Sequence, residues 1–212
     1  MPENKRQSTN NTKTIRFFTL GCKVNQYETQ GLEEEALRLG FCLDKQGQAD
    51  IYVINGCAVT ASAVVKSKDY ISRSRKENPK AKIVVCGCVA PHMSRDKADV
   101  FVPQSQKHNL FDIIAREMGV SNEPNHKNDI WSLSVSDSKN VRPFLKVQDG
   151  CDNCCSFCVI PSLRGRSISR PFDDVLLEAN RLSKKYKEIV LCGVNLACYG
   201  RDFTPKLSLE RL

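Results

Sequence analysis

The chain of 212 residues lacks any apolar run that approaches the ~20 residues needed to cross a bilayer. Residues 1–13 are polar and contain no apolar core of the kind that marks a secretory signal, so nothing in them indicates export. The same stretch has no hydrophobic periodicity, and we expect it to be a disordered tail. The sequence therefore predicts a cytoplasmic protein that does not associate with a membrane.

Tryptophan is scarce as well, and Trp131 is the one such residue. It lies within residues 121–141, a polar stretch rich in Pro, Asn, Asp and Ser. We interpret this stretch as a linker between a first domain at 14–120 and a second at 142–212. Trp131 is expected to pack on a domain surface, with stacking on a nucleic-acid base as the alternative.

Cysteine, by contrast, is abundant, with eleven residues, an odd number. In an exported protein these would suggest disulfides, but without a signal they indicate metal-binding or catalytic thiols. The composition, 41% hydrophobic and 26% charged, is typical of a globular protein. The formal net charge of +8 favours a polyanionic partner such as nucleic acid, although a moderately basic enzyme has the same charge.

The densest cysteine cluster is a C-x3-C-x2-C set formed by Cys151, Cys155 and Cys158, with Phe157 before the last. Three thiolates in one tight loop suit a cubane iron–sulfur cluster and leave its fourth iron open. Zinc is an alternative, because Cys154 makes two C-x2-C pairs possible. Those pairs abut, however, whereas the pairs of a tetrahedral zinc site usually come from separate segments. Plain buried or disulfide-bonded cysteines are the remaining alternative.

Short apolar runs alternate with helical patterns through the first domain. Residues 15–20, 51–54, 83–85 and 100–102 are predicted strands, and residues 109–118 have helical periodicity. Thr60 is a plausible N-cap for a helix after the second strand. This alternation predicts an α/β fold with a doubly wound parallel sheet.

Three cysteines follow the first three of these strands. Cys22, Cys57 and Cys88 each come just after a strand end, and parallel strands share one carboxyl edge. If the strands are adjacent, the three thiols converge and form a second candidate for a cluster with an open iron. The alternative is three buried structural thiols, because free cysteine is often buried.

The second domain begins with a predicted strand at 144–147, followed by the cysteine loop. An amphipathic helix is predicted over 171–186 and another strand over 188–191. A cysteine loop at the end of a first strand is the arrangement of α/β barrels, whose sites lie at that face. Arg164, Arg166 and Arg170 then belong either to an anion-contacting loop or to an exposed basic loop.

The cysteine loop, with Ile160-Pro161 and Arg164-Gly165-Arg166, resembles the radical S-adenosylmethionine (SAM) enzymes and, among them, the methylthiotransferases. The stretches at 19–29, 55–60 and 85–90 resemble the N-terminal domain of that family. The resemblance implies a doubly wound domain followed by the truncated start of a partial (β/α) barrel. It implies two 4Fe-4S clusters as well, one held by Cys151, Cys155 and Cys158 and one by Cys22, Cys57 and Cys88.

In the family the first cluster binds SAM and generates a 5′-deoxyadenosyl radical, and the second carries the sulfur to be inserted. Gly193-Val194-Asn195-Leu196 is similar to a family stretch near the SAM amino group. We therefore expect Phe157, Gly193 and Asn195 to contact the cofactor, and we assign no catalytic side chain. Cys86 stands where the family usually has threonine and is an alternative ligand to Cys88. The position of Cys88 favours Cys88 as the ligand.

The sequence of residues 19–29 resembles that of the branch that adds a methylthio group at C2 of N6-threonylcarbamoyladenosine, next to the anticodon of tRNA. The implied partners are the tRNA anticodon stem-loop and an electron donor such as flavodoxin or ferredoxin, and we expect a monomer. Alternatives are the branches acting on isopentenyladenosine or on a ribosomal protein aspartate, a non-enzymatic iron–sulfur module, and a zinc-containing nucleic-acid-binding domain. Because the resemblance covers about half of a family enzyme, we expect the chain alone to be inactive or unstable.

Two further groups of residues are left open. The predicted helix after Cys57 carries an excess of basic residues over 66–80, which suits either a solvated face or a face contacting phosphates. Cys42, Cys154, Cys192 and Cys198 are expected to be bystanders, with competition for a cluster as the alternative.

Overall fold

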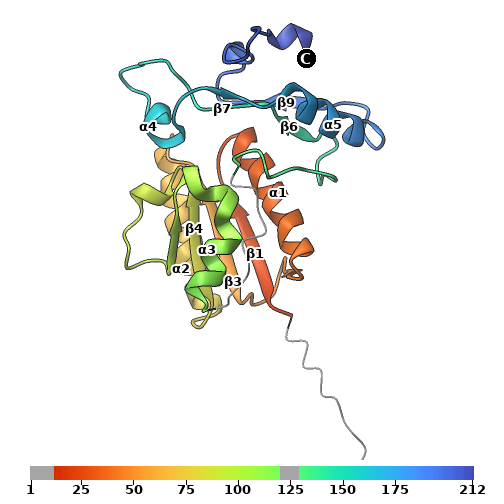
Figure 1. Ribbon diagram of the computed structural model, residues 1–212. Helices are drawn as coiled ribbons and strands as arrows, with labels where there is room; N and C mark the ends of the chain where they lie inside the picture. Colours follow the sequence, from red (N-terminus) through yellow and green to blue (C-terminus); the bar gives the residue numbers. More distant parts are fainter. Residues whose placement is uncertain (1–11, 120–128) are drawn as a thin grey trace, which may run out of the picture.

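The computed structural model describes residues 12–119 and 129–212 (Figure 1). The predicted disordered tail therefore lies almost wholly outside the described residues, as does the first part of the predicted linker. Within the described ranges, no helix is both long and apolar enough to cross a membrane.

The first unit is built on a five-stranded parallel sheet in the order β2-β1-β3-β4-β5. Its strands are β1 (Thr14–Thr19), β2 (Cys42–Leu43), β3 (Ile51–Gly56), β4 (Lys82–Gly87) and β5 (Val100–Val102). The four predicted strands are confirmed, and the strands that precede Cys22, Cys57 and Cys88 are neighbours in the sheet, which is the condition for the convergence of the three thiols. Strand β2 was not predicted, because two residues carry no readable period.

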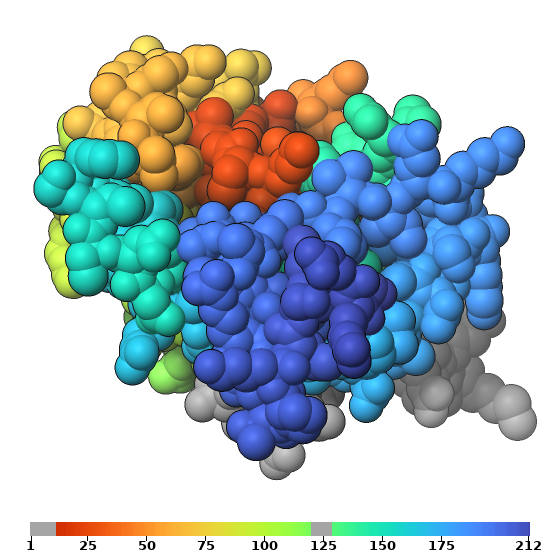
Figure 2. Space-filling view, turned by 90° about the horizontal axis from the view of Figure 1, so that it is seen from above, coloured from red at the N-terminus to blue at the C-terminus, as the bar shows by residue number. Residues whose placement is uncertain are grey.

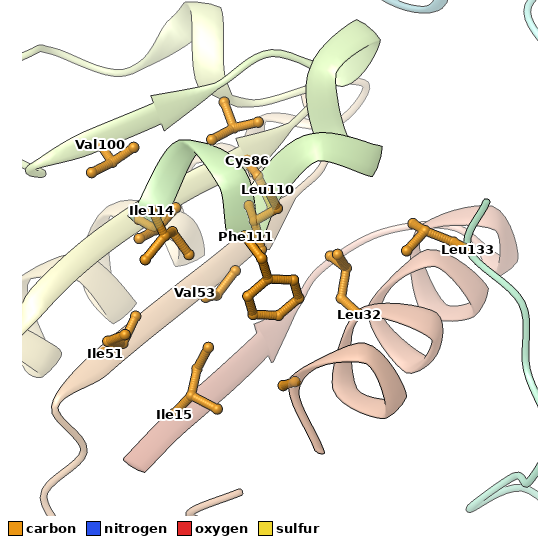
Figure 3. Close-up of a cluster of buried hydrophobic side chains, with 13 residues drawn as sticks. Ile15, Leu32, Ile51, Val53, Cys86, Val100, Leu110, Phe111, Ile114 and Leu133 are labelled. Atoms are coloured by element: carbon orange, nitrogen blue, oxygen red, sulfur yellow. The ribbon is translucent and has the colours of Figure 1, made fainter. Parts of the chain in front are cut away.

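Helices cover both faces of this sheet, as the doubly wound prediction requires (Figure 1). The helices are α1 (Lys23–Arg38), α2 (Ala61–Glu77) and α3 (Leu110–Glu117), with 3-10 turns at η1 (Ala90–His92) and η2 (Gln104–Asn109). Helices α1 and α3 share one core cluster, in which Phe111 lies among Ile15, Val53 and Leu32 (Figure 3). Helix α2 packs on the other face through Ile71.

Thr60 caps α2 as predicted. Its side-chain oxygen accepts a hydrogen bond from the amide of Ala63 at 3.2 Å. This bond satisfies one of the backbone donors that every helix start leaves without an intrahelical partner.

The second unit contains a parallel strand–helix–strand arrangement. Strands β6 (Phe144–Lys146) and β9 (Val190–Cys192) pair, and α5 (Phe172–Ser183) connects them. These are the elements predicted for the start of a partial barrel. An antiparallel pair, β7 (Gln148–Asp149) with β8 (Ile168–Ser169), was not predicted. The remaining elements are α4 (Ile160–Arg164), η3 (Leu196–Cys198) and η4 (Leu209–Arg211).

The described part of the predicted linker packs against both units. Leu133 joins the first core next to Leu32 (Figure 3), and Val135 is fully buried in a cluster with Val24 and Leu182. Trp131 packs near the Lys146 ammonium, which lies 5.1 Å from its ring centroid. Residues 129–141 are therefore a bridge that packs against both units through Leu133 and Val135.

The second unit sits over the carboxyl edge of the first sheet (Figure 1). Seen from above, its cyan-to-blue chain covers much of the top of the molecule, with the red start of α1 and the orange α2 visible beside it (Figure 2). Helix α1 packs against β6, which brings the two units into direct contact.

Candidate functional site

Three cysteines follow three neighbouring strands at one edge of the first sheet. In the register, Thr19 pairs with Asn55, and Gly56 pairs with Gly87. Cys57 and Cys88 directly follow paired residues, and Cys22 comes three residues after Thr19. Cys57 and Cys88 are buried, at 7% and 2% exposure, whereas Cys22 is exposed. We call these three residues the strand-edge cysteines.

Gly21 allows the ends of β1 and β3 to approach closely. Its φ is +121°, and a Cβ there would lie 2.6 Å from the Cβ of Cys57. A larger residue would push Cys57 away from the Cys22 turn and would be strained in this backbone conformation. The sequence Gly21-Cys22 therefore has a geometric reason as well as a chemical one.

Three further cysteines occupy the loop between β7 and α4. Cys155 is exposed, Cys151 and Cys158 are half-buried, and we call them the loop cysteines. The Cys151 amide donates to the Gly165 carbonyl at 3.1 Å, and the Cys158 amide donates to the Cys155 carbonyl at 3.0 Å. Backbone hydrogen bonds thus close the loop and bring its two ends together.

Gly150 is required at the neck of this loop. Its φ is +70°, and a Cβ there would meet the Arg166 carbonyl oxygen at 1.9 Å. Phe157, expected to contact a cofactor, is 89% exposed on the loop surface. Its assignment stays a prediction.

Asn195 lies beside the loop cysteines. Its side-chain amide donates toward the Cys151 sulfur at 3.8 Å, and its backbone amide donates to Gln148 at 2.7 Å. A Cβ on Gly193 would lie 3.0 Å from the Gln148 side chain, so the glycine lets the two strand ends pack. Asn195 thus contacts a loop cysteine, while the contact of Gly193 and Asn195 with SAM stays a prediction.

A buried charge cluster joins the two units below the cysteines. Glu28 on α1 accepts from Lys107 at 2.5 Å, from Lys146 at 2.8 Å and from Arg164 at 3.1 Å. Asp149 accepts from Lys146 at 2.6 Å and from Arg164 at 2.9 Å. Burial alone would raise the pKa of Glu28, but the three cations outweigh it and hold that pKa well below its usual range.

Arg164 also contacts the start of α1. Its guanidinium donates to Asn25 Oδ1 at 2.7 Å. Burial raises the pKa of the Cys88 thiol, while Arg164 and Lys107 act to lower it. A side chain of the second unit therefore hydrogen-bonds the first unit three residues after Cys22.

A second buried network lies on the other side of α1. The Tyr27 hydroxyl donates to Glu178 at 3.0 Å, and Arg170 pairs with the same carboxylate at 2.7 Å. The prediction that Arg164, Arg166 and Arg170 form an anion-contacting or exposed basic loop is wrong for Arg164 and Arg170. Their side chains are 1% and 5% exposed and paired within the chain, whereas Arg166 is 90% exposed.

Sequence reasoning did not single out the carboxylates and lysines of these networks: Glu28, Lys107, Lys146, Asp149 and Glu178. One signal was available for Glu178. It lies three residues after Val175 and four before Leu182, on the apolar face of the predicted helix, where a carboxylate needs a buried partner.

The thiol sets fit iron–sulfur clusters in their chemistry. All eleven cysteines are free, so both sets present thiol donors. Among the described residues, no three Cys, His, Asp or Glu side chains are grouped closely enough to hold one metal ion. A cubane takes each thiolate on a separate iron and so needs a wider spacing than a single ion does. The cationic side chains beside Cys88 suit an anionic group there.

The fold and site define an α/β protein that carries one cysteine set at the edge of a doubly wound sheet and another on a loop docked over that edge. A family model described as "Uncharacterized protein family UPF0004" matches residues 14–106. This match and the relatives described next support the methylthiotransferase family, and the similarity covers its N-terminal half.

Individual relatives support this assignment. The chain is 37% identical to the threonylcarbamoyladenosine tRNA methylthiotransferase of Thermotoga maritima, over 92% of this chain and 47% of the relative. It is also 37% identical to the enzyme of the same name from Chlamydia pneumoniae, over 88% of this chain and 44% of the relative. It is 35% identical to the tRNA-2-methylthio-N(6)-dimethylallyladenosine synthase of Anaplasma marginale, over 89% and 45%. The chain thus spans about half the length of these curated relatives.

Proposed function

We propose that this protein acts in tRNA methylthiolation, replacing the hydrogen on C2 of N6-threonylcarbamoyladenosine next to the anticodon with a methylthio group. The observation that carries the proposal is that the strand-edge cysteines follow neighbouring parallel strands at one carboxyl edge, while the unit that contains the loop cysteines sits over that edge (Figure 1). The names of the Thermotoga and Chlamydia relatives support the substrate. The tRNA anticodon stem-loop and a flavodoxin- or ferredoxin-like electron donor are the proposed partners, in the cytoplasm.

The residues divide between two 4Fe-4S sites. We assign Cys151, Cys155 and Cys158 to one cluster, with Asn195 donating toward the Cys151 sulfur. With SAM bound, such a cluster supplies the electron that cleaves SAM to a radical. We assign the strand-edge cysteines to the second cluster, where the buried positions of Cys57 and Cys88 keep water away.

Iron content tests this assignment. After anaerobic reconstitution with iron and sulfide, we expect about eight irons per chain in the parent, as two four-iron clusters require. Replacing either cysteine set by alanine should leave about four, and replacing the exposed Cys42 and Cys154 together should leave about eight. About four irons in the parent would favour an electron-transfer module, and zinc without iron would favour a zinc-containing nucleic-acid-binding domain.

The substrate is tested in cells. Deleting the gene should remove the methylthio group from N6-threonylcarbamoyladenosine in digested tRNA, as measured by mass spectrometry. Loss of the methylthio group from isopentenyladenosine, or from a ribosomal protein aspartate, with N6-threonylcarbamoyladenosine unaffected, would contradict the substrate and favour another branch.

A further inference from the structure

A cavity of about 210 Å³ lies between the two units. The first unit lines it with residues of α1 and η2, the second with residues of β6, β7, β8 and α4, and the bridge with Ile130, Trp131 and Leu133. The described residues that line it include no cysteine. Pockets for drug-sized ligands measure roughly 300–1,000 Å³, so this cavity suits a smaller molecule or an ion.

The buried side chains at this cavity carry more positive than negative charge. Lys107, Lys146 and Arg164 are 1–4% exposed, and the carboxylates that pair with them belong to Glu28 and Asp149. Among the described lining residues, three buried cations against two carboxylates leave one positive charge in surplus. A buried charge without a counter-ion is unfavourable, so the cavity favours an anion.

Lys107 also has donors that the protein does not use. An ammonium group has three N–H donors, and among the described residues Glu28 is its one hydrogen-bond acceptor, at 2.5 Å. Arg166 adds a further cation to the lining, although it is 90% exposed and pairs with Asp152. An anion in the cavity would therefore accept hydrogen bonds that the carboxylates leave unmade.

Gln104 sets a second requirement for the ligand. Its Nε2 donates to Glu28 at 3.0 Å, whereas its Oε1 is buried and has no hydrogen-bond partner among the described residues. Reversing this amide would set its oxygen against the Glu28 carboxylate, so the chemistry fixes its orientation. Because a buried acceptor without a partner is unfavourable, a well-matched ligand donates a hydrogen bond as well as carrying negative charge.

Inorganic phosphate has both properties. Near neutral pH it is anionic and keeps an O–H donor, whereas sulfate is an anion of similar shape that has none. The phosphodiester groups of RNA and the carboxylates of small acids also lack an O–H at this pH. Lysine and arginine side chains are common phosphate ligands, because they form charge-assisted hydrogen bonds with its oxygens.

We propose that the cavity between the two units binds inorganic phosphate, with the Lys107 ammonium donating to a phosphate oxygen and Gln104 Oε1 accepting from the phosphate O–H. Both units line the cavity, so bound phosphate stabilises their docked arrangement. The inference does not depend on the proposed function, because none of the described lining residues is assigned to an iron site.

Trp131 provides a signal from the cavity itself, because it is the only tryptophan in the sequence and belongs to the lining. The full chain, dialysed free of phosphate, is titrated near pH 7 with sodium phosphate and separately with sodium sulfate at matched ionic strength. We expect phosphate to change the tryptophan fluorescence in a saturable way. Sulfate should bind about tenfold more weakly or less, because it leaves Gln104 Oε1 without a donor.

Two variants separate the two requirements. Gln104→Met removes the acceptor at a similar side-chain length and should lower the phosphate affinity to about that of sulfate, without changing the sulfate affinity. Lys107→Gln removes a buried cation and should weaken the binding of both anions about tenfold. Gln106→Met is the matched control, at an exposed glutamine of the same 3-10 turn, and should leave both affinities unchanged.

Each outcome decides. The absence of a saturable phosphate signal, equal affinities for the two anions in the parent, or a phosphate preference that persists in Gln104→Met would overturn the inference. If Gln104→Met does not fold, Lys107→Gln decides instead. Binding about tenfold weaker than in Gln106→Met then supports the inference, and binding as tight as in the parent overturns it.

Discussion

The two cysteine sets are held in place in different ways. The strand-edge cysteines depend on the pairing of β1, β3 and β4, which are far apart in the sequence, and Cys57 and Cys88 are buried. The loop cysteines lie within eight consecutive residues, 151–158, and Cys155 is exposed. One set is therefore a product of the tertiary fold, and the other is a product of local sequence.

The two cysteine sets therefore depend on different parts of the structure. The second unit also sits over the edge that carries the strand-edge cysteines, and Arg164 joins it to α1 through an ion pair with Glu28 (Figure 1). The surroundings of the strand-edge site depend on the docking of two units as well as on one sheet. The loop site needs only its neck, where the Cys151 amide bonds to Gly165 and Gly150 adopts a positive φ.

Removing the Glu28 carboxylate is expected to have the largest effect on the docking of the two units. Glu28→Ala leaves Lys107, Lys146 and Arg164 without their shared carboxylate, and losing one partner of a buried ion pair costs about 3–5 kcal/mol. We expect a loss of this size in the free energy of unfolding, measured by urea denaturation at pH 7. The depressed pKa of Glu28 keeps its contribution present above pH 4.5 and removes it only as the pH falls further.

Glu35→Ala is the control for this variant. Glu35 lies on the same helix and pairs with Arg38 at the surface, where an ion pair contributes about 0–1 kcal/mol. If Glu28→Ala cost no more than Glu35→Ala, the charge cluster would not hold the two units together.

Thiol labelling sharpens the comparison directly. In the iron-free protein, iodoacetamide should modify Cys155 on the order of 100-fold faster than Cys57, because Cys57 reacts only after local opening. A 100-fold difference corresponds to about 2.7 kcal/mol of opening free energy. Peptide mass spectrometry gives both rates in one sample, and unfolding in guanidinium should make them similar. Equal rates in the folded protein would contradict the burial of the strand-edge set.

Sequence patterns were sufficient to predict the parts of the fold that depend on local sequence. Four of the five strands of the first sheet, the cap at Thr60 and the strand-end positions of the cysteines all follow from short apolar runs with clear ends. Placing Cys22, Cys57 and Cys88 at one edge required only the rule that parallel strands share an edge. These features were predictable because each depends on a stretch of fewer than ten residues.

The docking of the two units was not predictable in the same way. Lys107, Lys146 and Arg164 come from three separate segments, and a charged residue in a sequence is expected at the surface. Only the tertiary structure shows that they share one carboxylate. The sequence predicts a linker over 121–141 and does not show that residues 129–141 pack on both units, because the burial of Leu133 and Val135 depends on partners in α1 and α5.

A smaller effect is expected at the other buried network. Tyr27→Phe removes the hydroxyl that donates to Glu178 and accepts from Arg170 at 3.1 Å. Hydrogen bonds to charged groups contribute about 2 kcal/mol, so the free energy of unfolding should fall by about that amount. Tyr70→Phe is the matched control, because Tyr70 stacks its ring on Phe18, and it should change stability by less than about 0.5 kcal/mol. Similar losses in both variants would mean that the Tyr27 hydroxyl does not tie the units together.

Cys192 offers the smallest and most specific test, because it is a buried thiol between the units rather than a member of either set. It packs with Val24, Tyr27 and Leu182, and burial raises its pKa from 9.0 to about 12. A raised pKa means that the unfolded thiol ionises first, so stability present below pH 9 is lost as the pH rises toward 12. At pH 10 the loss should be about 1.4 kcal/mol relative to pH 7.

Comparing the pH dependence of unfolding in the parent and in Cys192→Ala isolates this loss, while Cys42→Ala, at an exposed thiol, should keep the parent profile. If Cys192→Ala also kept the parent profile, the interface around Cys192 would be open to water, and the close docking over the strand-edge cysteines would be wrong.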